Sequence, residues 1–216
     1  MTILNKRIGI LAGMGAAAGV LFYDLIVKEC QKRGAVCDSD FPEMIIYNLN
    51  SEAMDKTGVT DIEVLKKQLL KGIKLLNWAE CETILIACNS AYICYDYLQE
   101  NSVAKILNMP KITMLKCPEN YGVICSRFSR QHFIYSGLQT TDNEQDKADC
   151  LIQNVISGKN NPKDLTDLYM IVKSLFDRGA EKVVLGCTEL SILSDQILLK
   201  GKIIDSSRET IKELFN

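Results

Sequence analysis

The sequence predicts an α/β fold with two pseudo-symmetric, Rossmann-like lobes, each built on a parallel sheet, and two observations predict it. First, one pattern occurs twice, at residues 83–90 and 182–189: an apolar run, a small residue, a cysteine and polar residues that lead into a helical segment. Such β-branched and aliphatic runs are typical of buried parallel strands. Second, the chain opens with a strand, a glycine turn and a helix, which is the first unit expected of a doubly wound sheet.

The repeated pattern also predicts how the chain is divided. Roughly 100 residues separate Cys88 from Cys187, about the length of one small domain. We therefore interpret the chain as an old duplication in which two related lobes build one active site. The N-terminal lobe is expected over residues 1–100 and the C-terminal lobe over residues 101–216, with a terminal helix that is able to pack back on the first lobe.

Composition is typical of a globular protein and argues against some partners. Of 216 residues, 47% are hydrophobic and 24% are charged, enough for one deep core or two lobes. The net charge of −2 and the pI near 5.6 predict no basic patch, so neither nucleic acid nor an anionic membrane is expected as a partner. Neither a signal peptide nor a membrane span is expected, and the predicted location is cytoplasmic.

The nine cysteines match neither a metal site nor a disulfide framework. Their number is odd, no C-x-x-C spacing occurs, and His132 is the single histidine, so no metal site is expected. Since no oxidising compartment is expected either, most thiols are interpreted as buried or incidental. These are Cys30, Cys37, Cys81, Cys94, Cys117, Cys125 and Cys150. Cys88 and Cys187 differ because each follows a predicted strand.

Strands and helices are predicted to alternate in the first half of the chain. Strands are expected at residues 7–12, 44–48 and 83–87, and helices at residues 16–33, 61–80 and 91–100. The turn Gly13-Met14-Gly15 fits neither G-x-G-x-x-G nor a phosphate-binding loop with its lysine, so a nucleotide site is rejected. Gly13 and Gly15 are interpreted as a close approach of the backbone to a small ligand. The spacing of Asn50 and Ser51, after the second strand, predicts a turn.

The middle of the chain is less regular. Residues 111–115, 122–125 and 133–135 each have the pattern of a short strand. Only a few residues separate them, whereas a parallel crossover needs about a dozen or more. The three strands are therefore expected either to pair antiparallel or to have lost their crossover helices.

Regular alternation returns in the last third of the chain. Helices are expected at residues 142–157, 162–178 and 188–199, strands at residues 182–186 and 203–205, and a helix at the end. Pro162 at the first helical position and Gly179 after the last one are typical of helix ends. Ser206 or Ser207 is expected to cap the terminal helix, with Glu209 close by.

Cys88 and Cys187 are candidates for acid–base chemistry because each lies where a strand leads into a helix. The thiolate is the reactive form of cysteine, and the dipole and free amides of a helix N-terminus are expected to lower its pKa. Asn89, Ser90 and Thr188 add donors that are able to hold a carboxylate. One thiol on each side of a carbon suits proton removal from one face and delivery to the other. Taken singly, either cysteine is more often a small core residue, but the duplicated context favours function.

Four segments carry a resemblance to a known family. Residues 8–15, 87–91, 185–190 and 204–205 closely resemble motifs of the aspartate/glutamate racemase family, and the resemblance runs nearly end to end. The Gly-Met-Gly turn is most similar to the aspartate racemase branch. The resemblance implies a cofactor-independent racemase with two pseudo-symmetric lobes, an active site in the cleft between them and, commonly, a homodimer. It implies that Cys88 and Cys187 form the acid–base pair.

The resemblance also implies substrate-binding residues. They are Met14, Asn50, Asn89, Ser90, Ser126, Ser129, Thr188 and Lys159. Among them, Asn89, Ser90 and Thr188 correspond to ligands of the α-carboxylate and its surroundings. Ser126 and Ser129 fall where the family often has threonines.

The chain also departs from the family. Tyr92 stands where relatives usually have histidine, and Ala16 where they often have proline. Asn161 stands where relatives have a basic residue that helps to hold the distal carboxylate, and Lys159 is nearby. The segment 111–139 is shorter than in relatives, which agrees with the lost crossover helices.

The favoured function is racemisation of an acidic amino acid, aspartate or glutamate, without a cofactor. One alternative is a binding or regulatory protein of the same fold that has lost catalysis, and the shortened middle segment favours it. Another is a related isomerase of dicarboxylic acids, although the presence of both cysteines favours racemisation. Exchange of the substrate α-proton with deuterated water distinguishes an enzyme from a binding protein.

Overall fold

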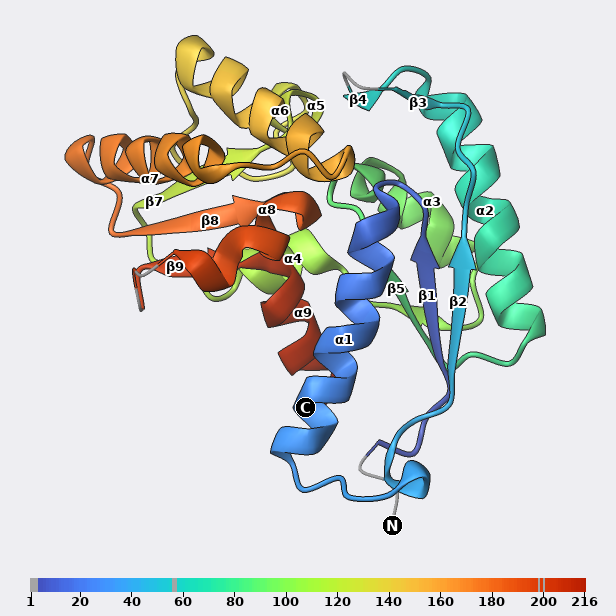
Figure 1. Ribbon diagram of the computed structural model, residues 1–216. Coiled ribbons are helices and arrows are strands. Elements are labelled where there is room, and N and C mark those ends of the chain that lie inside the picture. The colour runs from blue at the N-terminus through green and yellow to red at the C-terminus, as the bar shows by residue number, and fades with distance from the viewer. Residues whose placement is uncertain (1–3, 56–57, 198, 200) are drawn as a thin grey trace.

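Two parallel sheets, one from each half of the chain, form the framework of the protein (Figure 1). The computed structural model describes residues 4–55, 58–197, 199 and 201–216. The first sheet contains β1 (Ile8–Ala12), β2 (Met44–Asn48), β5 (Thr83–Ile86) and β6 (Lys105–Ile106), and the second contains β7 (Tyr121–Cys125), β8 (Lys182–Gly186) and β9 (Ile203–Asp205). Their orders are β2-β1-β5-β6 and β7-β8-β9, with every neighbour parallel. The predicted α/β class with parallel sheets is confirmed.

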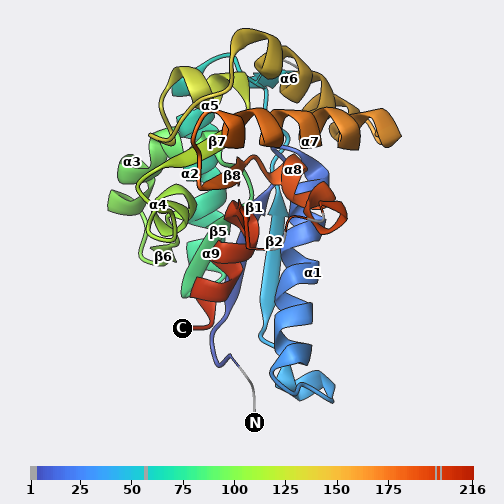
Figure 2. The ribbon, with the colours of Figure 1, turned by 90° about the vertical axis from the view of Figure 1, so that its left-hand side faces the viewer.

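Long helices cover both faces of the first sheet. The helices α1 (Ala16–Lys32) and α2 (Ile62–Trp78) lie on opposite sides of it, as Figure 1 and Figure 2 show. Each helix turns an apolar stripe toward the sheet, because its buried residues recur at helical spacing. These are Phe22 and Ile26 in α1, and Leu65, Leu69, Ile73 and Leu76 in α2.

The second sheet is covered by α6 (Asp142–Ile156) and α7 (Pro162–Asp177), which pack on each other and against β7. Both helices begin with a capping box, in which a side chain and the backbone satisfy each other's free groups. Thr141 does this for α6 and Asn161 for α7. Gly179 follows α7 with a φ of +98°, as expected of a residue after a helix end.

The last helix joins the second half of the chain to the first. Figure 2 shows α9 (Ser206–Leu214) beside α4 (Met109–Met114), and α9 also contacts α1. Ile211 and Leu214 of α9 belong to the core built around the first sheet. Sheet membership divides the chain between β6 and β7, and the division at residue 100 stays a prediction.

The prediction of a strand at residues 111–115 is wrong, because these residues lie in and just after α4. Asn108 caps this helix by accepting a hydrogen bond from the backbone N–H of Lys111 at 3.0 Å, and Pro110 lies in the first turn. The hydroxyl of Thr113 donates to the carbonyl of Met109 at 2.7 Å, which satisfies it inside the helix. The β-branched run was therefore misleading, whereas the cap and the proline indicated a helix.

The prediction of a strand at residues 133–135 is also wrong. A short helix, α5 (Arg127–Gln131), fills the space after β7, and the chain then turns through Phe133 with a φ of +48°. Only β7 of the three predicted middle strands forms, and it pairs with β8 in parallel. Residues 111–115 and 133–135 are not strands, so no crossover connects them to β7. The short spacing between the three segments therefore conflicts with nothing in the fold.

Three smaller predictions are corrected at helix ends. Asp205 caps α9, rather than Ser206 or Ser207, because its carboxylate accepts hydrogen bonds from the backbone N–H groups of Ser207 and Arg208. The helix predicted at residues 188–199 ends earlier, and residue 198 lies outside the described residues. The helix predicted at residues 91–100 begins as a 3₁₀ turn. The observed elements are α8 (Thr188–Leu193), η3 (Ser194–Gln196), η2 (Ser90–Cys94) and α3 (Tyr95–Glu100).

Two small elements complete the description. The short 3₁₀ helix η1 (Asp38–Asp40) precedes β2. The antiparallel pair of β3 (Met54–Asp55) and β4 (Gly58–Val59) follows β2. In the part of the chain that the structure describes, no helix has both the length and the apolar character that crossing a membrane requires.

Candidate active site

A cavity of about 1010 Å³ opens where the carboxyl ends of strands from both sheets meet. The turn after β1 contributes Met14, and the turn after β5 contributes Cys88. Ser126 follows β7 and Cys187 follows β8, so the second sheet supplies the other side. Loops at the carboxyl ends of parallel strands are where α/β proteins usually bind ligands. The position of the cavity therefore follows from the fold.

The structure brings both predicted cysteines to this cavity. Cys88 and Cys187 are each buried, and they come from different sheets. Backbone N–H groups of Ala91 and Ser90 point to the sulfur of Cys88, and that of Glu189 points to the sulfur of Cys187. Both residues therefore lie on the wall of one cavity, one from each sheet.

Glu189 is a cavity residue that the sequence reasoning missed. Its Oε2 accepts a hydrogen bond from the thiol of Cys187 at 3.0 Å and one from the hydroxyl of Thr188 at 3.1 Å. The side chain is buried, and burial raises the pKa of its carboxyl. The signal for it was its place two residues after Cys187, but an acidic residue in a first helical turn is usual and did not stand out.

The predicted lowering of the thiol pKa values is wrong for both cysteines. Burial, followed by the charge of Glu189, raises the pKa of Cys88 to about 12 and outweighs the N–H groups of Ala91 and Ser90. Burial and Glu189 also hold the pKa of Cys187 well above its ordinary value. Desolvation of a thiolate therefore costs more here than the helix ends return, and the thiols need a base to ionise.

The glycine turn fits around Glu189. Gly15 has a φ of +88°, and a Cβ there would lie 1.9 Å from Oε1 of Glu189. Gly13 has a φ of +95°, and a Cβ there would lie 2.0 Å from the carbonyl oxygen of Leu49. Both positions require glycine, for backbone conformation and for space. The turn lies on the wall of the cavity, against the protein's own carboxylate and backbone, and the predicted close approach to a small ligand stays a prediction.

Hydroxyl and amide groups line the same cavity as the cysteines. The Oγ of Ser90 lies 3.0 Å from both Ser126 Oγ and Ser129 Oγ, which joins the end of the first sheet to that of the second. Ser129 stands behind the other two and is absent from the cavity wall. Asn89 and Thr188 are buried and lie on the wall.

Comparisons with known proteins agree with this geometry. The sequence profile of the Asp/Glu/hydantoin racemase family matches residues 11–214. The chain belongs to this family. The broad specificity amino-acid racemase RacX of Bacillus subtilis (strain 168) is 26% identical over 211 residues, which cover 93% of this chain and 92% of that one.

Solved structures show the same fold. An aspartate racemase homologue from Pyrococcus horikoshii OT3 has a TM-score of 0.76 and 20% identity, with 97% of each chain covered. The aspartate racemase of Picrophilus torridus has a TM-score of 0.73 and 21% identity, with 97% of this chain and 93% of that one covered. The predicted family is confirmed, and with it the prediction of an amino-acid racemase, an isomerase, which fits catalysis without pyridoxal phosphate.

Among the residues that the structure describes, two cations line the active-site cavity of this racemase, and their surroundings differ. Arg127 pairs with Asp149 at 2.8 Å and with Asp146 at 2.6 Å, so its charge is already balanced. Lys159, in the exposed loop between α6 and α7, has no ion pair with any described residue. Asn50, which follows β2 of the first sheet, also lines the cavity.

Tyr92 has a structural position in the racemase. Its hydroxyl donates to the carbonyl of Leu107 at 2.8 Å, and the residue is buried outside the cavity wall. It ties η2 to the segment after β6. The residue therefore supports the first sheet rather than the reaction.

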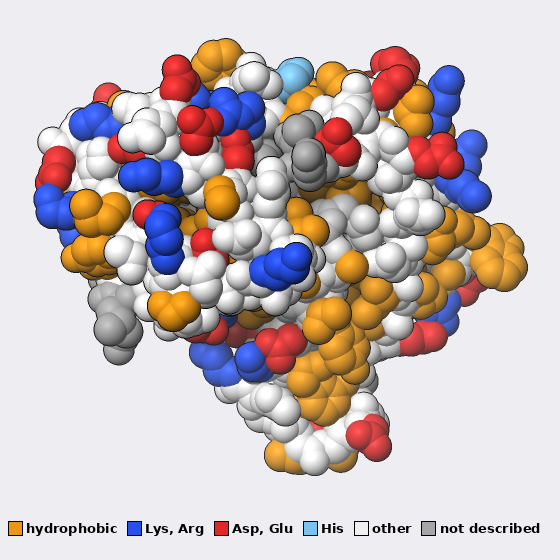
Figure 3. Space-filling view, turned by 45° about the horizontal axis from the view of Figure 1, so that its top comes forward, with side chains coloured by type: hydrophobic (Ala, Val, Ile, Leu, Met, Phe, Trp, Pro, Cys, Tyr) orange, Lys and Arg blue, Asp and Glu red, His pale blue; other side chains and the backbone are white. Residues whose placement is uncertain are grey.

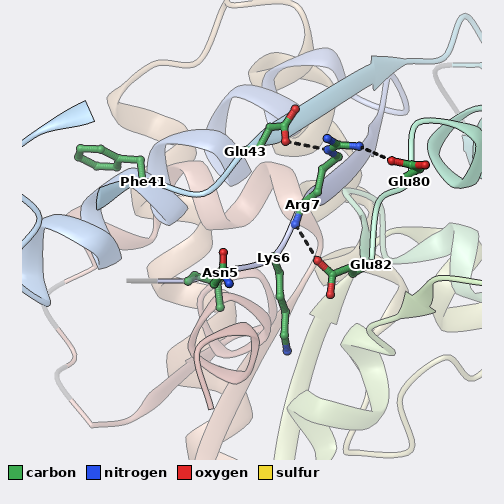
Figure 4. Close-up of a pocket in the computed structure, with 8 residues that line it drawn as sticks. Asn5, Lys6, Arg7, Phe41, Glu43, Glu80 and Glu82 are labelled. Atoms are coloured by element: carbon green, nitrogen blue, oxygen red, sulfur yellow. Dashed lines mark hydrogen bonds and ion pairs between the residues drawn. The ribbon is translucent and has the colours of Figure 1, made fainter. Parts of the chain in front are cut away.

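A second pocket lies at the amino ends of the first-sheet strands, away from both cysteines. Figure 4 shows that Arg7, one of the residues that line it, pairs with Glu43 and Glu80, while its backbone N–H donates to Glu82. The guanidinium of Arg7 is therefore engaged by two carboxylates of the protein itself. Over the described part of the chain, no group of three or more His, Cys, Asp or Glu residues is placed to hold a metal ion.

Proposed function

We propose that the protein racemises a free amino acid by acid–base catalysis with Cys88 and Cys187, without a cofactor. The observation that carries the proposal is that both sulfurs line one cavity from two different sheets. Groups from opposite walls are suited to reach opposite faces of one tetrahedral carbon. Removal of the α-proton on one side and delivery on the other inverts the carbon.

Glu189 supports a specific first step. Its carboxylate accepts the thiol hydrogen bond of Cys187 at 3.0 Å, which is within reach for proton transfer. In the proposed sequence Glu189 takes that proton, the Cys187 thiolate takes the α-proton, and the thiol of Cys88 protonates the resulting carbanion from the other face. Cys88 is then the thiolate, and the reverse reaction begins from it.

The groups between the two cysteines suit the α-carboxylate of the substrate. Asn89 and Ser90 present amide and hydroxyl groups on the cavity wall, and Ser126 adds a further hydroxyl. Thr188 lines the same wall and is proposed to contact the substrate, although its hydroxyl hydrogen is donated to Glu189. A carboxylate accepts up to four hydrogen bonds, so it matches such a set. Ser129 is proposed to hold the hydroxyls of Ser90 and Ser126 in place from behind.

For the substrate side chain we propose a carboxylate, as in aspartate or glutamate. Lys159 is the cation that supports this proposal, because Arg127 is engaged by two aspartates.

A second candidate function is racemisation of amino acids of several kinds. The similarity to a broad specificity amino-acid racemase and the cavity volume of about 1010 Å³ favour it. Met14 and Asn50, which line the same cavity, are proposed to contact the substrate in either case.

The test is exchange of the α-proton in deuterated water, followed by NMR with acidic, neutral and basic amino acids. We expect exchange with aspartate or glutamate, and its loss in Cys88→Ser and in Cys187→Ser. Cys150→Ser is the matched control, because Cys150 is an exposed thiol that lines the same cavity. Exchange that survives both active-site substitutions contradicts the mechanism, and exchange with all three classes of amino acid supports the broader activity.

We also propose a cytoplasmic homodimer. All nine cysteines lie within the described residues and are free thiols, which suits a reducing compartment.

Hydrophobic side chains gather over α1 (Figure 3), where Val20 is 69% and Tyr23 45% exposed, close to Ile46 on the edge strand β2. Light scattering is expected to give twice the chain mass, and a monomer at all concentrations contradicts the dimer.

A further inference from the structure

Tyr135 links the two halves of the candidate active site without lining the cavity. The residue is fully buried, and its hydroxyl donates to Oδ1 of Asn89 at 2.5 Å. Its ring packs against Gly186, where a Cβ would lie 2.7 Å from Cε2 of the tyrosine. Asn89 directly follows Cys88 and Gly186 directly precedes Cys187. The Tyr135 side chain thus contacts the residue that follows Cys88 and the residue that precedes Cys187.

The distances assign the orientation of the Asn89 amide. The bond to Tyr135 is 2.5 Å long, and the bond to Ser206 Oγ is 3.2 Å long. Hydrogen bonds between two oxygens reach down to about 2.5 Å, whereas N–H···O bonds are usually about 2.7 to 3.2 Å long. The amide oxygen therefore faces Tyr135 and the nitrogen faces Ser206.

This orientation leaves one group of Asn89 for the cavity. Its Oδ1 accepts from the phenol and one Nδ2 hydrogen goes to Ser206, so the second Nδ2 hydrogen remains on a residue that lines the cavity. A donor suits a carboxylate, and an amide turned the other way would present an oxygen that repels it. The phenol favours this choice, because its hydroxyl donates a short hydrogen bond to the amide oxygen from the buried side.

We propose that Tyr135 is a positioning residue of the racemase, which turns the Asn89 amide so that it donates to the substrate α-carboxylate. The inference rests on the proposed function. It adds a residue from the segment 133–135, outside both cysteine motifs, to the machinery of the site. Because its ring and its hydroxyl have separate contacts, the two contributions are separable by substitution.

The experiment compares Tyr135→Phe with Tyr121→Phe. Tyr121 belongs to the same small core cluster as Tyr135, and its hydroxyl lies 3.0 Å from that of Ser136, away from Asn89. Both variants lose one phenol hydroxyl, so similar falls in melting temperature are expected. Only Tyr135→Phe is expected to raise KM, by about tenfold, with kcat changed less than about twofold, because the α-carboxylate is held equally before and during proton transfer.

A double-substitution cycle adds a readout that packing alone does not move. If Tyr135 acts through Asn89, Tyr135→Phe is expected to raise KM in the wild-type chain and to have little further effect in Asn89→Ala. Should Tyr135→Phe fail to fold, Ser206→Ala removes the other restraint on the same amide and is expected to raise KM in its place.

The outcomes separate the inference from the proposed function. A wild-type chain that exchanges no α-proton with any amino acid overturns the function and the inference together. A wild-type chain that is active, with equal KM values in Tyr135→Phe and Tyr121→Phe, overturns the inference alone. Additive effects of Tyr135→Phe and Asn89→Ala on KM overturn it as well.

Discussion

Glu189 is the buried carboxylate whose charge opposes ionisation of both candidate thiols. Burial raises its own pKa, so the folded protein holds a proton on it more tightly than the unfolded chain does. The resulting stability is greatest below the ordinary glutamate pKa of about 4.3 and is lost as the pH rises through the raised pKa. A neutral residue at this position escapes that loss.

Glu189→Gln is therefore expected to melt at a higher temperature than the wild type at pH 8, with a difference that shrinks toward pH 4. Its kcat is expected to fall by about 10² to 10⁴, because the base that activates Cys187 is gone. Thermal melts at several pH values and the NMR exchange rate measure the two effects. Glu63→Gln, at an exposed position, is the control. A stabilisation that is independent of pH contradicts the assignment.

The sequence predicted those residues of the candidate site that belong to a recognisable local motif. The two cysteines and the polar residues beside them lie in a repeated pattern, so Asn89, Ser90 and Thr188 reach the cavity as predicted from the strand ends. The role of Glu189 was not predictable in this way. A carboxylate in a first helical turn usually faces solvent, and only the folded structure shows that this one is buried and bonded to Cys187 and Thr188.

Helix caps decide the elements that the hydrophobic pattern leaves open. The carboxylate of Asp205 accepts from two backbone N–H groups of α9 and from the hydroxyl of Ser191 at 2.7 Å, and the side chain is buried. Asp205→Ala leaves these donors without an acceptor. We expect a loss of about 2 to 4 kcal/mol in the free energy of unfolding.

Thr141→Ala is the matched comparison, because Thr141 caps α6 at an exposed position. We expect it to cost about 1 kcal/mol, since water replaces the lost acceptor. Urea unfolding of both variants measures the difference. Equal losses would mean that Asp205 acts as an ordinary cap and that its burial adds nothing.

At the level of elements, the sequence predicted what local signals determine. The strands that end in Cys88 and Cys187 and the helix that begins at Pro162 form as expected, because apolar runs and helix-end residues agree there. Residues 111–115 form a helix instead of a strand, because the cap at Asn108 outweighs β-branched residues in a short segment. Tyr135 anchors its segment by one side chain and needs no strand.

The arrangement of the two sheets was predictable only in outline. Duplication predicted two related units, and the order of strands within each sheet follows from their connections. The wall formed by α6, however, depends on how the second sheet is turned toward the first. No local pattern encodes that angle, because contacts far apart in the chain set it, among them those of α9 with α1 and α4.

These long-range contacts predict that the two sheets unfold together. Ile211 of α9 is buried in the core of the first sheet, although α9 directly follows β9 of the second. Ile211→Ala is expected to cost about 2 to 5 kcal/mol, as loss of a buried aliphatic side chain usually does. Because α9 follows the second sheet in sequence and packs on the first, both sheets are expected to lose stability.

Hydrogen exchange measured by mass spectrometry tests this coupling. In Ile211→Ala, the amides of β1 and β8 are expected to lose protection by similar factors, since both depend on the docking of α9. Met170→Ala, which removes an exposed side chain of α7, is expected to leave both unchanged. Loss of protection in β1 with β8 intact would show two independently folding lobes. The candidate active site, which needs a cysteine from each sheet, would then depend on contacts other than α9 to hold its walls together.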